Sequence, residues 1–116
     1  MKREAQRQRP EDICPVTRAM SLIGYKWAGL VVWQLMDGPK RHGELLRALP
    51  GISPKTLTDR LRELEGERVL ERRVFAEVPP RVEYELTDRG RSLYEVYEAM
   101  VRWAEADQAG HADRAG

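Results

Sequence analysis

The stretch from Ser53 to Glu65 constrains the fold more than any other part of the sequence, because it combines several signals of a short helix. Ser53 suits the N-cap position, since its hydroxyl can accept a hydrogen bond from an otherwise unpaired backbone N–H. Pro54 fits the first helical position, where a missing donor costs nothing. The apolar residues recur at the spacing of one buried face, and they are Leu57, Leu61 and Leu64. The stretch therefore predicts an amphipathic helix.

The opposite face of this predicted helix is polar and suits insertion into a DNA groove. It carries Lys55, Thr56, Asp59, Arg62 and Glu63, with Thr58 and Arg60 on the flanks. Short hydrogen-bonding groups lie beside cations near the start of the helix, where the backbone amides and the helix dipole also favour phosphates. An ordinary amphipathic surface helix has the same pattern. This segment alone therefore leaves both interpretations open.

The preceding segment predicts another short helix and a turn. Residues 43–49 direct Leu45, Leu46 and Leu49 inward, and Pro50-Gly51-Ile52 follows as the turn. Two short helices joined by a three- or four-residue turn that contains glycine are the signature of a helix-turn-helix. The predicted motif spans about residues 43–66.

Two further helices are predicted upstream. The first spans about residues 15–23, between Pro15 and Gly24. The second continues to Met36 and is apolar almost all round, which places it at the centre of the core. Residues 1–12 are polar and charged, and they are expected to form a flexible arm.

The segment after the helix-turn-helix predicts a β-hairpin at about residues 69–86. Val82, Tyr84 and Leu86 alternate with charged residues, as in a half-buried strand. The strand before it alternates less cleanly, and two prolines lie at the tip between them. A helix-turn-helix followed directly by a hairpin is a winged helix. The predicted fold class is therefore mostly α with a small β-hairpin (α+β).

The last predicted helix runs from residue 88 to about residue 106, and its apolar residues cover more of the wheel than one core-facing stripe needs. Such an excess in a small domain favours contact with a second subunit, although the same residues could cover the domain's own first helix. The residues assigned to this dimer interface are Leu93, Tyr94, Tyr97, Val101 and Trp103. Residues 107–116 are expected to form a flexible tail.

Composition narrows the class of protein. The 116 residues, 41% hydrophobic and 34% charged, fit one soluble globular domain. Residues 40–81 hold ten Lys and Arg against seven Asp and Glu, whereas residues 82–116 hold four against eight. Residues 1–39 hold six against four, so the helix-turn-helix region is the most positive part of the chain by a modest margin, which supports DNA binding. No apolar run approaches the roughly 20 residues that span a bilayer and no secretory signal is present, so a cytoplasmic location without a membrane partner is expected.

Several blocks of the sequence resemble the HxlR-type (DUF24) family of bacterial winged-helix transcriptional regulators. These blocks are Cys14-Pro15-Val16, Leu22 to Trp27, Gly43-Glu44-Leu45, Pro50 to Thr58, Leu61 to Glu65 and Glu77 to Tyr84. The resemblance runs from about Cys14 to Trp103. It implies a homodimer held by the first and last helices, with one recognition helix and one wing per subunit on a palindromic operator. Two departures are Glu67-Arg68, where an acidic residue and glycine are common, and Tyr25, which replaces a frequent Gly or Asp.

Side chains near the start of the 53–65 helix are expected to read bases, because helix-turn-helix proteins contact base edges there. This set comprises Ser53, Lys55, Thr56, Thr58 and Asp59. Asp59 can accept a hydrogen bond from cytosine, or it can pair with a cation such as Arg62. Arg62 itself is expected to clamp a phosphate, and Arg60 to be structural.

The hairpin and the first helix of the motif add further candidate DNA contacts. Arg73 and Arg81 flank the hairpin tip and could enter or border a minor groove, or they could simply lie on a solvated strand edge. Arg41 could touch the DNA backbone, whereas a plain surface role is expected for His42. Affinity would come mainly from phosphate contacts and sequence choice from base contacts.

Cys14 is the one cysteine of the chain and precedes a predicted helix start. That position and Arg18, one turn further on, should lower the pKa of its thiol. Some members of the resembling family use such a cysteine to sense oxidants or electrophiles, which here would require an intersubunit disulfide or an adduct. A small apolar group packed under the first helix is the alternative. Metal binding by a lone thiol and two distant histidines is not expected.

The sequence thus predicts a homodimeric, sequence-specific regulator that binds double-stranded DNA, with oxidant sensing at Cys14 as an open question. A winged helix that serves only as a protein-interaction module is the alternative. An enzyme is not expected, because no phosphate loop, carboxylate pair or metal-ligand cluster is present and Cys14 lacks a plausible base. No cofactor is expected.

Overall fold

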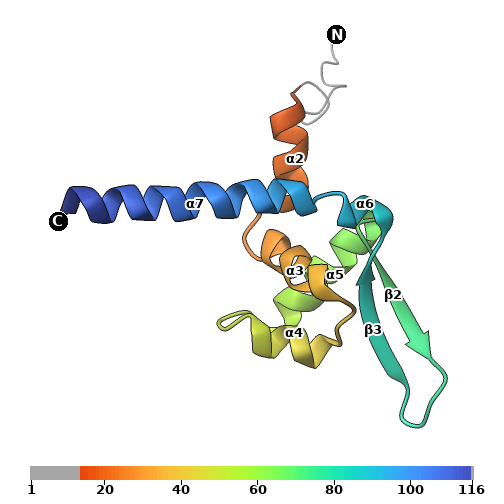
Figure 1. Cartoon of the computed structure of the whole chain (residues 1–116). Helices are drawn as coiled ribbons and strands as arrows, with labels where there is room; N and C mark the ends of the chain where they lie inside the picture. Colours follow the sequence, from red (N-terminus) through yellow and green to blue (C-terminus); the bar gives the residue numbers. More distant parts are fainter. Residues whose placement is uncertain (1–13, 116) are drawn as a thin grey trace.

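The structure of the protein is a computed structural model that describes residues 14–115, with side chains described as far as His111 (Figure 1). The predicted arm at residues 1–12 lies outside these residues. In chain order the elements are α2 (Pro15–Ile23), α3 (Ala28–Gln34), the 3-10 helix η1 (Leu35–Asp37), α4 (His42–Ala48), α5 (Pro54–Gly66), β2 (Leu70–Phe75), β3 (Arg81–Leu86), α6 (Asp88–Arg91) and α7 (Tyr94–Ala115). Helices dominate and a two-stranded hairpin follows α5, which confirms the predicted fold class.

The helix-turn-helix is formed by α4 and α5, and the leucine face of α5 packs into the core as predicted. Leu57, Leu61 and Leu64 are buried. They belong to the same core as the apolar helix α3, whose Val31 and Val32 are completely buried. Full burial of a side chain of this size contributes about 1.5–3 kcal/mol. This burial determines which face of α5 is left for solvent.

The turn before α5 sets where that helix begins. The hydroxyl of Ser53 accepts a hydrogen bond from the backbone N–H of Thr56 at 3.0 Å, which confirms the predicted N-cap. Gly51 has φ of +98°, a backbone conformation that glycine adopts without a steric penalty. On α4, the carboxylate of Glu44 accepts from the backbone N–H of Arg41 at 2.7 Å. Both helices of the motif therefore start at a defined residue.

The strands β2 and β3 form an antiparallel hairpin, which we call the wing. Its register pairs Leu70 with Leu86 at the base and Phe75 with Arg81 near the tip. On its other edge, β3 is joined to Lys40 by backbone hydrogen bonds in both directions with Tyr84, at 3.0 and 2.8 Å. This bridge attaches the wing to the segment just before α4, and Figure 1 shows the wing projecting from the domain.

The prediction of one continuous helix over residues 88–106 is wrong, because this segment belongs to two separate helices. The hydrogen bonds from Leu93 to Gly90 and from Val96 to Leu93 span only three residues, and they separate the short helix α6 from α7. Gly90 lies so close to the base of the wing that a side chain there would collide with the backbone carbonyl of Val69. This contact holds α6 against the hairpin while α7 leaves in a new direction.

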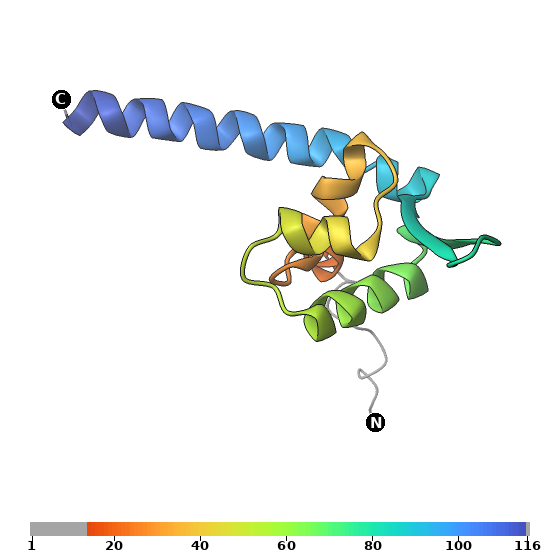
Figure 2. The same ribbon diagram turned by 90° about the horizontal axis from the view of Figure 1, so that it is seen from below.

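The predicted flexible tail is also corrected, because α7 continues to Ala115. Alanine is the strongest helix former, and alanines are frequent in the second half of α7. Figure 2 shows α7 as a long rod on the side of the domain opposite α5, extending well beyond the other elements. The helix that carries the predicted dimer contacts and the helix that carries the predicted DNA contacts therefore lie on opposite sides.

Candidate nucleic-acid interface

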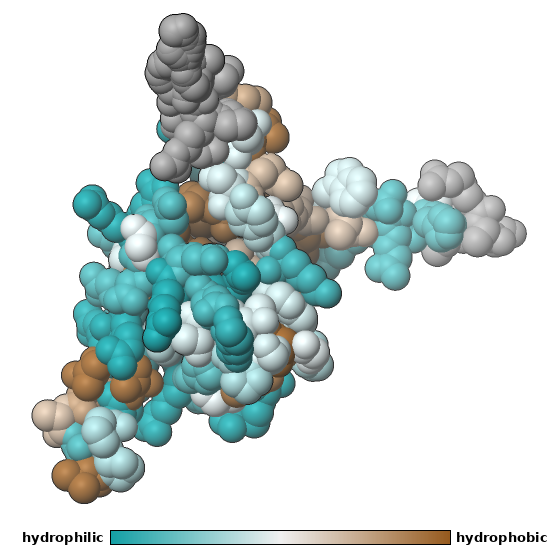
Figure 3. Space-filling view, turned by 180° about the vertical axis from the view of Figure 1, so that it is seen from behind, coloured by the Kyte–Doolittle hydropathy of each residue, from teal (hydrophilic) through white to brown (hydrophobic). Residues whose placement is uncertain are grey.

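The solvent-facing side of α5 carries the residues predicted to read bases. Ser53 and Lys55 are exposed, while Thr56, Thr58 and Asp59 are partly exposed. Seen from behind, the face on which α5 lies is covered largely by hydrophilic residues (Figure 3). Because its leucines fill the core, α5 presents its polar N-terminal half to solvent, as a recognition helix does.

Lys55 and Asp59 pair with each other on the exposed side of α5. The ammonium of Lys55 donates to the carboxylate of Asp59 at 2.9 Å, one helical turn away. This hydrogen bond, with smaller contributions from Arg60 and Arg62, lowers the pKa of Asp59 below its ordinary value. Asp59 thus pairs with a cation, but with Lys55 in place of the expected Arg62, which is exposed to solvent.

His42 joins the two helices of the motif and is not a plain surface residue. Its Nε2 lies 3.1 Å from the hydroxyl of Thr58, and both side chains are partly buried. The expectation for His42 is therefore wrong, because the crossing of α4 over α5 brings two residues sixteen positions apart into contact. The hydroxyl of Thr58 therefore already has a hydrogen-bond partner within the protein. Arg41, the neighbouring candidate for a DNA backbone contact, is exposed.

Arg81 is held on the wing by its neighbours. Its guanidinium donates to Glu77 at 2.8 Å and to Glu83 at 2.6 Å, and it lies over the ring of Phe75 at 3.8 Å. The hydrogen bond from Arg81 lowers the pKa of the Glu77 carboxyl. The two carboxylates offset the charge of Arg81, so its side chain mainly stabilises the hairpin tip.

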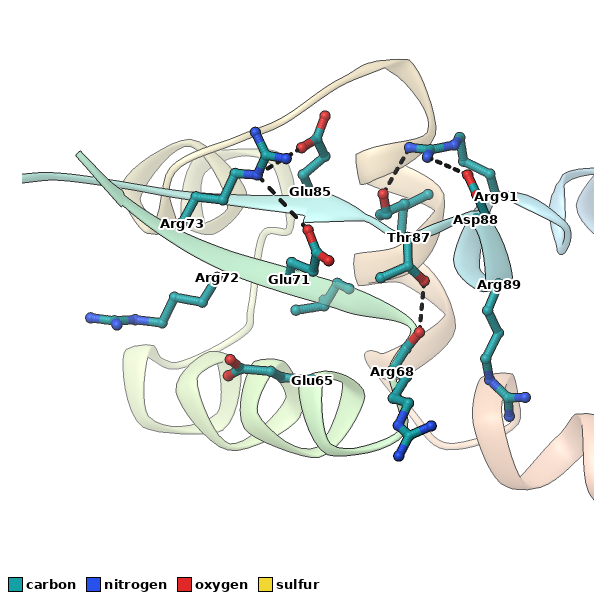
Figure 4. Close-up of a pocket in the computed structure, with 12 residues that line it drawn as sticks. Glu65, Arg68, Glu71, Arg72, Arg73, Glu85, Thr87, Asp88, Arg89 and Arg91 are labelled. Atoms are coloured by element: carbon teal, nitrogen blue, oxygen red, sulfur yellow. Dashed lines mark hydrogen bonds and ion pairs between the residues drawn. The ribbon is translucent and has the colours of Figure 1, made fainter.

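Arg73 is paired as well, across the two strands. Its Nε lies 3.2 Å from the carboxylate of Glu85 and 3.9 Å from that of Glu71. Figure 4 shows this group at one end of a hollow beside the base of the wing. Charged cross-strand neighbours of this kind stabilise a hairpin and reduce the charge that is left for DNA.

The same hollow brings Arg73 together with four arginines that sequence reasoning missed. It has a volume of about 830 Å³, and its lining includes Arg68, Arg72, Arg73, Arg89 and Arg91. Arg91 is bound to the carbonyl of Leu86 and the carboxylate of Asp88, both at 2.7 Å. Figure 4 shows Arg68 and Arg89 pointing in the same direction, from the end of α5 and from α6. No local pattern could reveal this cluster, since its members lie on separate elements.

Cys14 occupies the N-cap position of α2 and is partly exposed. The start of α2, chiefly the backbone N–H of Thr17, lowers the pKa of the Cys14 thiol below its ordinary value. The hydroxyl of Thr17 and the N–H of Val16 act in the same direction. The predicted direction of the shift and one of its two predicted causes, the start of the helix, are confirmed, whereas Arg18 is not among the causes.

An open apolar groove of about 990 Å³ lies between α3 and α7, on the side away from α5. All three tryptophans of the chain line this groove, together with Tyr25, Leu30, Val96, Tyr97, Met100 and Val101. Leu30 is 50% exposed and Trp103 is 69% exposed. The groove therefore leaves a broad aromatic surface in contact with water, which a lone soluble domain rarely does.

The prediction that Tyr97 lies in the dimer interface is wrong, because its side chain belongs to the core of its own chain. Its side chain is 5% exposed, and its hydroxyl donates to the backbone carbonyl of Gly29 at 2.8 Å. Burial raises the pKa of Tyr97 to about 12. The indole of Trp33 stacks near both Tyr94 and Tyr97, at centroid distances of 6.4 and 5.3 Å. Leu93 also packs against this core, whereas Tyr94, Val101 and Trp103 stay exposed.

Two further kinds of site are absent from the part of the chain that the structure describes. No group of three or more His, Cys, Asp or Glu side chains lies close enough together there to hold a metal ion. None of the helices in this range has the length and apolar character to cross a bilayer.

Comparison with known proteins agrees with this geometry. Residues 22–111 match the family described as HxlR-like helix-turn-helix. The chain is 51% identical over 88 residues to an uncharacterized HTH-type transcriptional regulator of Synechocystis sp., sll1512, covering 76% of this chain and 65% of that protein. It is 45% identical over 94 residues to the HTH-type transcriptional regulator YodB of Bacillus subtilis, covering 80% of this chain and 84% of YodB.

Solved structures extend the similarity to three dimensions. Reduced YodB aligns with a TM-score of 0.72 and 42% identity, covering 84% of this chain and 92% of that one. The redox regulator HypR in its reduced form aligns with a TM-score of 0.78 and 40% identity, covering 82% and 94%. YodB has also been solved in quinone-bound and diamide-treated forms.

Proposed function

Because the chain belongs to the HxlR-like helix-turn-helix family of transcriptional regulators, we propose that it binds a palindromic operator as a homodimer through α5 and the wing. The observation that carries this proposal is the polar N-terminal half of α5, held at the surface by leucines that are themselves in the core. Such a helix enters the major groove with its first turns, while the backbone amides at its start face phosphates.

A second copy of the chain is the proposed occupant of the apolar groove. The exposed Trp103 and Leu30 line the groove, and exposed apolar residues also lie on α2, at Val16 and Met20. Helix α2 lines the groove only with its last residue, Ile23, and both Leu30 and Trp103 stay exposed, which argues against the alternative that α7 only shields its own first helix. A two-fold axis through α2 and α7 would bury both apolar faces and would place the two copies of α5 side by side on one DNA duplex.

Base reading is assigned to Lys55 and Thr56, which are accessible at the start of α5. On DNA, a phosphate or a guanine edge would compete with Asp59 for the ammonium of Lys55. Arg62 and Arg41 are assigned to phosphates, because both are exposed cations beside the motif. Arg73 and Arg81 would contribute to DNA binding only after giving up part of their contacts with wing carboxylates.

We further propose that Cys14 makes this regulator responsive to electrophiles or oxidants. YodB, its relative, has been solved with bound quinone and after diamide treatment, and HypR is a redox regulator. Hydrogen bonds from Thr17 favour the thiolate of Cys14, which is the reactive form. The thiolate would add to a ring carbon of a quinone, forming a C–S bond while the quinone oxygen takes up a proton. Alternatively, an oxidant such as diamide would take up two electrons and two protons from two Cys14 thiols, one of each subunit, and leave an intersubunit disulfide.

The alternative, a winged helix used only for protein interactions, predicts binding that is insensitive to salt. DNA binding predicts the opposite, because binding to phosphates releases counterions and the affinity for DNA should fall steeply as salt rises. The proposed site of action is DNA in the cytoplasm, at the nucleoid.

The decisive experiment is a gel shift or fluorescence anisotropy titration with DNA from upstream of its own and neighbouring genes. We expect a dimer to bind one such fragment in preference to a scrambled fragment, with an affinity that falls as salt rises. Lys55→Ala and Thr56→Ala should weaken operator binding about tenfold or more, in the range of one lost base contact per subunit. Glu105→Ala, on the far side of the domain, is the matched control. Equal binding to all fragments, or no binding to any, would refute the proposal.

A further inference from the structure

Trp27 has a backbone conformation that only its surroundings can maintain. It precedes α3 as its N-cap residue with φ of +79°, a left-handed conformation that side chains other than glycine rarely adopt. Its indole is partly buried and packs against the hydrophobic core. The position of the ring is therefore determined by its contacts and not by local preference.

The indole of Trp27 contacts the turn of the helix-turn-helix on one side and lines the apolar groove on the other. A β-carbon at Gly51 would lie 3.6 Å from Cη2 and 3.9 Å from Cζ2 of Trp27, so the outer edge of the ring packs on the backbone of the turn. Gly51 has φ of +98° and lies just before Ser53, the N-cap of α5. Trp27 also lines the groove assigned to a second copy of the chain.

Trp27 is in addition closely tied to α2. Only Gly24, Tyr25 and Lys26 separate it from the end of α2, and this short link is fixed by two backbone hydrogen bonds. The N–H of Gly24 donates to Met20 at 2.7 Å, and the N–H of Ala28 donates to Tyr25 at 3.2 Å. A displacement of α2, which starts at Cys14, must therefore move the backbone of Trp27.

We propose that Trp27 is a positioning residue for DNA recognition, which transmits the state of α2 and of the groove to the turn that starts α5. This inference rests on the proposed function and adds how α2 and the groove are connected to the helix that reads DNA. When the groove is occupied and α2 is in place, the indole supports Gly51 and the first turn of α5 stands in its reading position. When Cys14 reacts and α2 shifts, the indole withdraws its support from Gly51. Operator binding is then lost because the first turn of α5 moves, while the buried leucine face of α5 stays in place.

The test compares Trp27→Phe with Met36→Leu in the full-length protein. Both side chains pack against the core, but only Trp27 reaches the turn, and a phenylalanine at position 27 lacks the outer ring edge that reaches Gly51. Sedimentation at the working concentration must first show that both variants are dimers like the parent. We expect Trp27→Phe to weaken operator binding about tenfold and Met36→Leu to change it less than about threefold, in the range of coupling through a packed side chain.

Amide hydrogen exchange separates the relay from a general loss of stability. We expect faster exchange in Trp27→Phe at residues 51–57 alone, and unchanged exchange in the core of α3. Diamide treatment of the parent protein should speed exchange in the same segment, and this response should shrink in Trp27→Phe. If Trp27→Phe does not fold, Trp27→Tyr replaces it in the same comparison.

The possible results discriminate clearly. Parent-like operator binding and exchange in the variant at position 27 would overturn the relay, as would an equal loss in both variants. If the parent protein binds no DNA at all, the proposed function fails. The exchange comparison then still decides whether Trp27 connects α2 with the turn before α5.

Discussion

The imidazole of His42 and the hydroxyl of Thr58 lie 3.1 Å apart and join the two helices of the helix-turn-helix. The pair lies beside the buried Leu57 and Leu45, so it extends the apolar contact between α4 and α5 with a polar one. A hydrogen bond at such a partly buried site typically contributes about 0.5–1.5 kcal/mol. It also gives Thr58 a fixed rotamer in the helix that is proposed to read DNA.

A double-mutant cycle on His42 and Thr58 should therefore show energetic coupling. We expect His42→Ala and Thr58→Val each to lower the free energy of unfolding, and the double variant to lose about 1 kcal/mol less than the sum of the two. Urea unfolding monitored by circular dichroism provides the values. Additive effects would mean that the contact contributes nothing in solution.

Asp59→Asn should strengthen binding to DNA of any sequence. The change removes a negative charge from the proposed DNA face and releases the ammonium of Lys55, which now pairs with it. We expect affinity to rise severalfold on operator and scrambled DNA alike, with a salt dependence steeper by about one counterion per subunit. A loss confined to the operator would instead identify Asp59 as a reader of cytosine. Glu105→Gln, which removes the same charge from α7 on the opposite side of the domain, is the control.

The reactivity of Cys14 should depend on Thr17 more than on Arg18. Because Thr17 lowers the thiol pKa through its N–H and its hydroxyl, we expect alkylation by iodoacetamide to reach half its maximal rate at a pH below that of free cysteine, about 8.5. Thr17→Val should raise this midpoint, since it removes the hydroxyl and keeps the N–H. Arg18→Ala should leave it unchanged, and a larger shift in that variant would contradict the assignment. Alkylation rates are followed by mass spectrometry between pH 5 and pH 10.

Tyr97→Phe should destabilise the domain, and the effect should depend on pH. The hydroxyl of Tyr97 donates to the buried carbonyl of Gly29, so its removal should cost about 1 kcal/mol at pH 7. Burial raises the folded pKa to about 12, above the unfolded value of about 10. The neutral phenol therefore stabilises the fold fully below pH 10, and this contribution is lost as the pH rises towards 12.

The measurement is thermal or urea unfolding of the parent and of Tyr97→Phe between pH 7 and pH 11. The stability difference between them should narrow above pH 10. Tyr94→Phe is the matched control, since its hydroxyl donates to Glu98 on the exposed side of α7 and should contribute little. A constant difference across the whole pH range would argue against a buried Tyr97 phenol.

Gly90→Ala should be among the most destabilising single-methyl additions in the chain. The added carbon would lie 2.2 Å from the carbonyl oxygen of Val69, which also accepts from the N–H of Thr87 at 3.0 Å. Relieving this clash must move α6 away from the wing, so we expect a loss of about 2–4 kcal/mol. Gly66→Ala faces open space at the end of α5 and should be neutral or slightly stabilising. Melting temperatures of the two variants provide the comparison.

Much of the fold could be predicted because its signals are local. The N-cap at Ser53 and the leucine face of α5 each act within a few residues, and the structure contains both. The alternation at residues 81–86 correctly predicts the strand β3, but only Leu86 is buried there and the other residues are partly exposed. The candidate DNA-reading residues on α5 followed from the same pattern, since burying the leucines leaves the opposite face for solvent. For the same reason Cys14 could be placed at a helix start and expected to have a lowered thiol pKa.

Most failures of prediction have one physical origin, which is contact between residues distant in the chain. The flexible tail expected at residues 107–116 is the exception, because the alanine-rich end of α7 is helical through local propensity. A helical wheel places Tyr97 beside Met100, but only the packing of α7 on α3 directs one to Gly29 and leaves the other exposed. The break between α6 and α7 depends on the approach of Gly90 to Val69 across the base of the wing.

Local patterns in the chain thus determined which segments are helices and strands, where they start, and which face of α5 meets water. Only the tertiary structure decided which polar groups remain available on those faces. His42 joins Thr58 across two helices, and Arg73 meets Glu85 across two strands. The reason is that caps and hydrophobic periodicity act along the backbone, whereas the pairing of charges and hydroxyls is set by the angles at which the elements cross.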